Sequence, residues 1–257
     1  MISTDAMLTV LRDVAEEVIR PKFRALTSDE VIQKGPGDLV TVADRLAEER
    51  IVAKLEKLAP NALLVGEEGT FAGDMDPAAL ASAEVAYTID PIDGTSNFVR
   101  GNPDYGVMVA EVRDGVTTRA WIWQPEHGVA WTAELGGGTH RNNQRVHPIE
   151  RSGKPRGSAS AKKHRGMDGG GRLDPVRSTL WSAAFDYPNV VTGGGDFVYY
   201  NKLKPWDHLP GALLLTEVGG VSRTRDGADY TAATTGQGLI AAATPEIWDL
   251  ANEVWPA

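Results

Sequence analysis

The chain has 257 residues, of which 42% are hydrophobic and 24% charged, a composition typical of a globular protein with a substantial core. Its net charge of −9 argues against a protein that binds duplex nucleic acid, and the absence of cysteine excludes disulfides, thiolate zinc sites and cysteine nucleophiles. No apolar stretch approaches the roughly 20 residues that cross a bilayer, and acidic residues interrupt the N-terminal apolar pattern, so we expect a cytoplasmic protein without a signal peptide.

The first predicted elements are two amphipathic helices. Apolar residues recur at three- and four-residue spacing from about Thr4, and this helix should end near Pro21. Thr41 should cap a second helix that is closed by Pro60. Its expected buried stripe consists of Ala43, Leu46, Ala47, Ile51, Leu55 and Leu58.

Two polar residues accompany the second helix. Lys34 belongs to a glycine-flanked segment, residues 34–38, which we expect to be a mobile loop with an exposed lysine. Closure of Lys34 over a phosphate or a metal is the alternative. Asp44 falls in the first turn of the helix, where a surface carboxylate that complements the helix dipole is the commoner role.

Acidic residues directly follow two short apolar runs. Residues 62–65 predict a strand that is followed by Glu67 and Glu68, and residues 85–89 predict a strand that leads into the hexapeptide DPIDGT, residues 90–95. Open α/β folds place their ligands beyond the carboxyl ends of strands. These acidic residues are therefore candidate ligand-binding groups.

The hexapeptide has the composition of a metal site beside an anion site. Pro91 should lead a turn that brings Asp93 back beside Asp90, and two close carboxylates repel each other unless a cation lies between them. Oxygen ligands of this kind suit Mg²⁺ or Mn²⁺. Gly94 allows close backbone approach, and Thr95 should cap a short helix whose free amides would face a phosphate. An ordinary turn is the structural alternative.

The remaining elements divide into a meander and a second region. Residues 105–112, 117–123 and 129–133 predict consecutive antiparallel strands. Residues 136–177 are rich in Gly, Ser, Arg and Lys and are interpreted as solvated loops. A strand at 198–200 and a helix at 206–217, ended by Gly219, follow.

The motifs GEEG (66–69), DPIDGTSNF (90–98) and WDHLPGALLLTEVGG (206–220) together resemble the inositol monophosphatase family of metal-dependent, lithium-sensitive phosphatases of sugars and polyols. The resemblance covers most of the chain. It implies an α+β fold, a layered αβαβα sandwich with a six-stranded antiparallel sheet in the first half, residues 1–135, and a smaller α/β half, residues 136–257. It also implies a homodimer that acts on a small phosphate ester, while the acidic charge and the lack of a long apolar stretch lead us to expect no nucleic-acid or membrane partner.

The resemblance assigns a role to each motif residue. Glu67, Asp90 and the carbonyl of Ile92 would hold a first Mg²⁺, and Asp90, Asp93 and Asp207 a second. A third Mg²⁺, bound more weakly, would be held by Glu67 and water. Thr95 would orient the attacking water with the help of Asp44, and Gly94 and Thr95 would contact the phosphate.

The substrate side departs from the family pattern. The position seven residues before Asp207, where the family has a glutamate that binds ring hydroxyls, is Tyr200, and Trp181 replaces a customary glycine beside Ser182 and Ala183. Hydrolysis of inositol 1-phosphate is nevertheless the first hypothesis for the activity. Histidinol phosphate, fructose 1,6-bisphosphate and 3′-phosphoadenosine 5′-phosphate are alternative substrates, and a regulatory interaction protein with the same fold is an alternative class.

The histidines carry less information. His208 follows Asp207 and could contact a ligand, although a packed position is the preferred interpretation. The other histidines show no metal-ligand spacing and are expected at the surface: His127, His140, His147 and His164.

Overall fold

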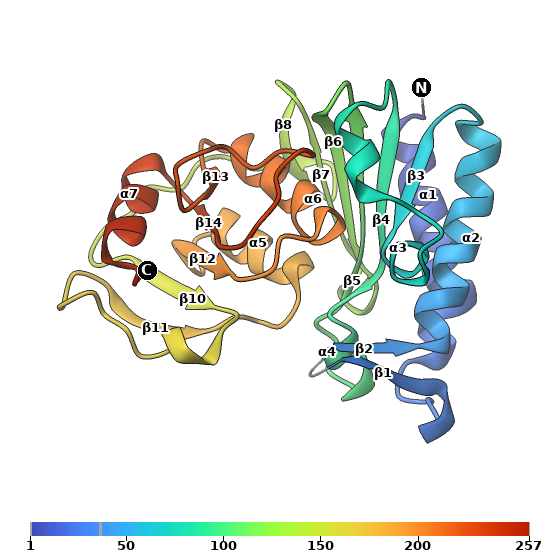
Figure 1. Cartoon of the computed structure of the whole chain (residues 1–257), viewed down its shortest axis with the longest axis horizontal. Coiled ribbons are helices and arrows are strands. Elements are labelled where there is room, and N and C mark those ends of the chain that lie inside the picture. Colours follow the sequence, from blue (N-terminus) through green and yellow to red (C-terminus); the bar gives the residue numbers. More distant parts are fainter. Residues whose placement is uncertain (1, 36–37, 257) are drawn as a thin grey trace.

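The molecule is a sandwich of alternating helical and sheet layers (Figure 1). The computed structural model describes residues 2–35 and 38–256. The α-helices are α1 (Thr4–Val14), α2 (Val42–Leu58), α3 (Glu67–Ala72), α4 (Thr95–Val99), α5 (Ala183–Val191), α6 (Pro205–Thr216) and α7 (Pro245–Val254). Across the molecule, α1 and α2 cover a large sheet, α5 and α6 lie between this sheet and a smaller one, and α7 covers the far side of the smaller sheet. The predicted α+β sandwich with its αβαβα order is confirmed.

The large sheet is a seven-stranded sheet within the described residues, one strand more than expected. Its order follows the chain: β3 (Leu63–Gly66), β4 (Ala86–Asp93), β5 (Gly106–Arg113), β6 (Val116–Gln124), β7 (Val129–Glu134), β8 (Gly138–Arg141) and β9 (Gln144–Arg145). The predicted meander forms β5 to β7. Only the pair β3 and β4 is parallel among these strands, so the sheet is not wholly antiparallel as the resemblance implied.

The smaller sheet is mixed. In spatial order it consists of β11 (Asp174–Ser178), β10 (Arg156–Ala159), β12 (Phe197–Tyr200), β14 (Leu239–Ala242) and β13 (Val221–Thr224). The interpretation of residues 136–177 as loops was therefore wrong for four short strands, β8 to β11. These strands are two to five residues long and poor in β-branched and aromatic side chains, so pairing with neighbours rather than intrinsic propensity makes them strands.

The helical face of the large sheet differs from expectation in detail. The chain continues past Val14 as a π-helical turn, Ala15–Ile19, and a 3₁₀ turn, Arg20–Lys22, so Pro21 is accommodated at the end of the element. Thr41 caps α2 as predicted, but Leu46 and Leu58 are 39% and 47% exposed and do not belong to the buried stripe. None of the helices in the described part of the chain is long and apolar enough to cross a membrane.

The segment before α2 forms a hairpin that the sequence did not predict. β1 (Val31–Gly35) pairs with β2 (Asp38–Thr41), and Lys34 lies on β1. The centre of the predicted loop, residues 36 and 37, lies outside the described residues.

A buried ion network ties the first strands of the large sheet together. The carboxylate of Glu111 on β5 accepts hydrogen bonds from Tyr87 Oη on β4 at 2.7 Å and from Arg119 Nε on β6 at 3.1 Å, with a further bond from Arg113 Nε at 2.8 Å. Burial alone would raise the pKa of Glu111, but the bonds from Arg119 and Arg113 outweigh it and lower the pKa to about 2. The network thus links β4, which leads into the hexapeptide, to the centre of the sheet.

Glu111→Gln should lower the free energy of unfolding at neutral pH by about 3 kcal/mol, because it leaves the Arg119 guanidinium buried without its carboxylate. Urea unfolding measures this, and Glu134→Gln, at an exposed position of β7, should change little. Since the folded-state pKa of Glu111 lies below its unfolded value near 4.5, the wild-type advantage is complete above that value and should shrink as the pH falls toward 2. An unchanged difference at low pH would contradict this account.

Candidate active site

Three carboxylates from separate parts of the chain meet at one end of the large sheet. Because β3 and β4 are parallel and Gly66 pairs with Ile89, the next residues along the two strands, Glu67 and Asp90, emerge side by side. Asp207 reaches the same point from the first turn of α6. Carboxylate oxygens of Glu67, Asp90 and Asp207 all lie within 4.8 Å of one another. The structure thus brings together three of the predicted acidic residues.

The cluster concentrates negative charge in a place with little solvent. Burial, followed by the charges of Glu67, Asp93 and Asp207, raises the pKa of Asp90 well above its usual value. Burial also raises the pKa of Asp207 to about 8, against the opposing effect of Lys204. Hard oxygen donors held this close, two of them strongly desolvated, fit a divalent cation such as Mg²⁺ or Mn²⁺, since a cation would relieve both the desolvation and the repulsion.

Two lysines lie against the cluster. Lys204 Nζ is 2.8 Å from Glu67 Oε1. Lys34 Nζ is 2.5 Å from Glu68 Oε1 and 3.6 Å from Glu67 Oε1, and its side chain is only 3% exposed. The expectation of an exposed loop lysine was therefore wrong, because the β1–β2 hairpin delivers Lys34 to the two glutamates after β3.

The hexapeptide extends the strand instead of leaving it in a turn. Asp90 pairs with Met108 and Asp93 with Gly106, so three steps along β4 oppose two along β5. This irregularity is a β-bulge, and it accommodates Pro91, which has no N–H to donate to the ladder. Asp93 consequently lies beside Asp90, although the predicted turn is absent at this point.

Asp93 connects the two halves of the molecule. Its Oδ2 accepts hydrogen bonds from the hydroxyl of Ser182 and, at 2.8 Å, from the amide of Ala184 at the start of α5. Burial raises the pKa of Asp93 to about 6 despite these bonds. Asp93 therefore fixes the second half of the chain against the bulge, with Ala183 in the first position of α5.

Thr95 and Asp44 are in direct contact. Thr95 Oγ1 lies 3.1 Å from Asp44 Oδ1 and 3.1 Å from the carbonyl oxygen of Ile92. Asp44 is buried, and burial raises its pKa to about 7. The cap of α4 is Gly94, with φ of 86°, so Thr95 is the first helical residue and not the cap, which leaves its hydroxyl directed to Asp44. Asp44 is likewise a buried residue and not a surface carboxylate.

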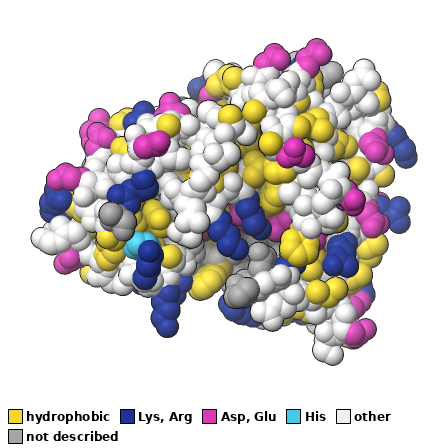
Figure 2. Space-filling view, viewed as in Figure 1, with side chains coloured by type: hydrophobic (Ala, Val, Ile, Leu, Met, Phe, Trp, Pro, Cys, Tyr) yellow, Lys and Arg dark blue, Asp and Glu magenta, His cyan; other side chains and the backbone are white. Residues whose placement is uncertain are grey.

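A cavity of about 220 Å³ opens over these groups. In Figure 2, lysine and arginine side chains border acidic ones where the two parts of the molecule meet. The predicted site residues that line the cavity are Glu67, Asp90, Ile92, Asp93, Gly94, Thr95 and Asp207. Leu39, Lys202 and Lys204 also line it and were missed by sequence reasoning, although the run Lys202 to Lys204 directly precedes the motif of Asp207 and offered a signal.

Trp181 and Tyr200 occupy different environments. Trp181 lies on the cavity wall with 48% of its surface exposed, its φ of 65° is uncommon for a bulky residue, and the guanidinium of Arg165 lies 5.1 Å from its ring. The ring of Tyr200 instead is buried against Tyr187 and His208. Tyr200 is not among the residues that line the cavity.

The histidines have no part in the acidic cluster. His208 is buried, with Nε2 2.9 Å from the carbonyl of Lys202 and Nδ1 3.3 Å from Tyr187 Oη, and burial lowers its pKa to about 4. It is thus a packed residue, in the preferred interpretation. His164 is buried between Tyr199 and Trp255, so its expected surface position was wrong.

Comparisons with known proteins identify the family of the chain. The model of the inositol monophosphatase family matches residues 3–255. An inositol-1-monophosphatase of Mesorhizobium japonicum is 31% identical over 242 residues, which is 88% of each protein, and a Nus factor SuhB of Xylella fastidiosa is 30% identical over 88% of this chain and 83% of that protein. The structure of an IMPase from Thermotoga maritima superimposes with a TM-score of 0.82 at 26% identity, covering 97% of this chain and 96% of that one. The chain belongs to the inositol monophosphatase family and is a phosphoric monoester hydrolase.

Proposed function

We propose that this protein is a Mg²⁺-dependent phosphomonoesterase that hydrolyses a small sugar or polyol phosphate, with inositol 1-phosphate as the first candidate. The convergence of Glu67, Asp90 and Asp207 beside the pair of Thr95 and Asp44 is the observation that carries the proposal. Mn²⁺ is an alternative ion.

Two to three ions would share the carboxylates. One ion would be held by Glu67, Asp90 and the carbonyl of Ile92. A second would be held by Asp90, Asp93 and Asp207, and a third would be coordinated by Glu67. When bound, such ions lower the pKa of a water and stabilise charge on the departing ester oxygen. The oxygen-only donor set and the raised pKa values of Asp90 and Asp207 support this arrangement.

The chain's own groups would position the reactants. Thr95 Oγ1, which is bonded to Asp44, would orient the attacking water, and buried Asp44 would accept a proton or hold the hydroxyl in place. The amides of Gly94 and Thr95 would face the phosphate at the start of α4. Lys204 and Lys202 on the cavity wall add positive charge that favours an anionic substrate.

The identity of the ester is the open part of the proposal. Ser182, Ala183 and Tyr200 are the substrate contacts predicted from the sequence, but all three are buried and none lines the cavity, whereas Trp181 is a large exposed side chain on its wall. A tryptophan beside an arginine suits a planar or anionic leaving group as well as a polyol. Histidinol phosphate, fructose 1,6-bisphosphate and 3′-phosphoadenosine 5′-phosphate therefore stay alternatives.

A regulatory role is the second candidate, because relatives named Nus factor SuhB are about as similar as those named inositol-1-monophosphatase. The complete set of acidic residues argues against a role without catalysis. We also propose that the chain forms a homodimer, and sedimentation equilibrium tests this. In addition, we propose that residues 1–135 and residues 136–257 form two halves that meet at the site.

Asp93→Asn should lower kcat/KM for phosphate release by at least about 100-fold, since it removes a charge that would hold the cation. Circular dichroism should show a retained fold, because Asn keeps an oxygen for Ser182 and the amide of Ala184. Asp249→Asn, at an exposed position of α7, is the matched control and should leave turnover unchanged. Full activity of Asp93→Asn, or full activity of the wild type after removal of divalent ions by a chelator, would refute the metal assignment.

Thr95→Ala and Asp44→Asn should each lower kcat by about 100-fold or more with little change in KM, because water positioning acts mainly in the transition state. The double variant should lose scarcely more than either single one, since the two groups act through one hydrogen bond. Steady-state kinetics measure all three, with Thr95→Ser expected to retain most activity. Additive losses would show that Thr95 and Asp44 act separately.

Of the four candidate esters, we expect inositol 1-phosphate to release phosphate fastest in the presence of Mg²⁺. Millimolar Li⁺ should inhibit, as the family resemblance implies. Turnover of none of the four esters would reject this choice of substrates, and a rate unaffected by Li⁺ would count against lithium sensitivity.

A further inference from the structure

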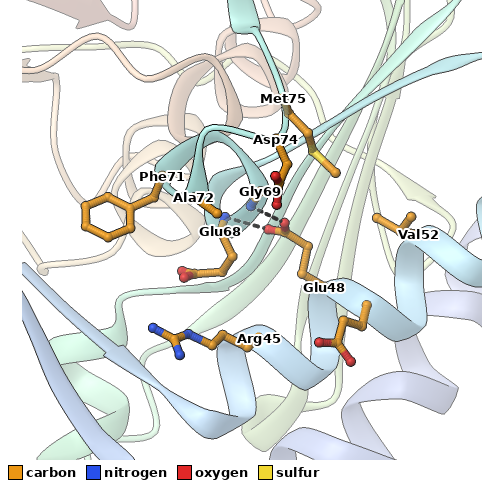
Figure 3. Close-up of a pocket in the computed structure, with 10 residues that line it drawn as sticks. Arg45, Glu48, Val52, Glu68, Gly69, Phe71, Ala72, Asp74 and Met75 are labelled. Atoms are coloured by element: carbon orange, nitrogen blue, oxygen red, sulfur yellow. Dashed lines mark hydrogen bonds between the residues drawn. The ribbon is translucent and has the colours of Figure 1, made fainter.

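A buried glutamate that is not part of the acidic cluster lies directly behind it. Glu48 on α2 is 4% exposed and follows Asp44 by one helical turn, so both lie on the face of α2 that is turned to the site. Figure 3 shows its carboxylate pointing from α2 to the first turn of α3. Oε2 accepts a hydrogen bond from the amide of Glu68 at 2.8 Å, and Oε1 accepts one from the amide of Gly69 at 2.7 Å.

These two amides are unpaired within α3, because the first N–H groups of any helix have no carbonyl partner in the helix. A carboxylate that accepts both makes two charge-assisted hydrogen bonds, which are stronger than neutral ones. Glu67, whose carboxylate belongs to the cluster, is the residue immediately before the two bonded amides. The hydrogen bonds that these amides donate to Glu48 therefore fix the orientation of the backbone from which the Glu67 side chain projects.

Gly66 makes this contact possible. A Cβ atom at this position would overlap the carboxyl group of Glu48. The backbone of Gly66, with φ of −98° and ψ of 159°, is one that other residues adopt readily, so the requirement for glycine is one of space and not of conformation. Gly66, the residue before Glu67, thus leaves the space that the Glu48 carboxylate occupies.

Side-chain packing between α2 and α3 contributes less to the position of α3 than these hydrogen bonds do. A cavity of about 530 Å³ lies between α2 and α3 and is lined by Glu48, Val52, Gly69, Phe71 and Met75 (Figure 3). Beyond the two hydrogen bonds, Lys34 also contacts α3, through its ion pair with Glu68 and by lying 4.9 Å from the ring of Phe71. The position of α3 therefore depends on polar contacts at its first turn.

We propose that Glu48 is a positioning residue, which holds the first turn of α3 so that Glu67 can bind the divalent cation together with Asp90 and Asp207. The inference rests on the proposed metal-dependent function. Groups that orient metal ligands in this way commonly change metal affinity by about 10- to 100-fold when they are mutated.

The test is Mn²⁺ binding to the whole protein without substrate, measured by electron paramagnetic resonance. Glu48→Gln should weaken Mn²⁺ binding by at least about 10-fold, because Gln offers one acceptor oxygen and turns its own N–H groups toward a second amide. Hydrogen exchange of the Glu68 and Gly69 amides in the metal-free protein should accelerate in the same variant. Glu49→Gln, the exposed neighbour on α2, is the matched control and should change neither quantity.

A second variant separates positioning from folding. Gly66→Ala keeps the charge of Glu48 but displaces its carboxylate, so it should weaken Mn²⁺ binding in the same direction and serves as the test if Glu48→Gln does not fold. Thermal unfolding without metal establishes that each variant is folded. A folded Glu48→Gln or Gly66→Ala protein with wild-type Mn²⁺ affinity would overturn the inference.

The outcome also separates this inference from the proposed function. Wild-type protein that binds Mn²⁺ but hydrolyses no phosphate ester, together with weak binding by Glu48→Gln, would reject the function and support the role of Glu48. Wild-type protein that hydrolyses esters with equal Mn²⁺ affinity in both proteins would reject the role of Glu48 alone. Wild-type protein that binds no Mn²⁺ would reject both.

Discussion

Three carboxylates crowded into a poorly solvated cavity repel one another, and much of this fold serves to hold them there. Glu67 opens α3 directly after β3, Asp90 lies on β4 and Asp207 lies on α6, so three separate elements supply the carboxylates. The repulsion raises the free energy of the folded chain, and the surrounding layers of helix and sheet must offset it. Lys34 and Lys204 supply part of the compensation through their ion pairs with Glu67.

The backbone around the cluster is adapted to this task. The parallel pairing of β3 and β4 sets Glu67 beside Asp90, and the bulge at Pro91 and Ile92 sets Asp93 beside both. The same bulge ends at Gly94, whose left-handed conformation turns the chain into α4 and directs Thr95 to Asp44. A single stretch of β4 and α4 therefore presents both the acidic groups and the hydroxyl.

The second half of the chain contributes in two ways. It closes the cluster with Asp207, and it is fastened to the bulge by the bonds of Ser182 and Ala184 to Asp93. The wall that a leaving group would meet is formed by different residues, Trp181 and Lys202 among them. In the proposed function, separate parts of the cavity would therefore carry the reaction chemistry and the choice of substrate.

The sequence alone determined the identity of the acidic residues, the family and the layered α+β architecture. The acidic residues and the family have local signals, the short motifs with fixed spacing around Asp90 and Asp207, and the layered architecture followed from the resemblance that these motifs carry. Helical periodicity for α2 and alternating strands and turns for the meander predicted individual elements. The short strands β8 to β11 lacked such signals, because their polar segments become strands only by pairing with neighbours.

Only the tertiary structure decided which side chains meet. Lys34 appeared in the sequence as a loop lysine and Leu46 as a core residue, yet Lys34 is buried beside Glu68 and Leu46 is exposed. Glu48 resembled any other charge on an amphipathic helix. The physical reason is that burial and hydrogen bonding depend on elements far apart in the chain, and no local pattern specifies which face another element will cover.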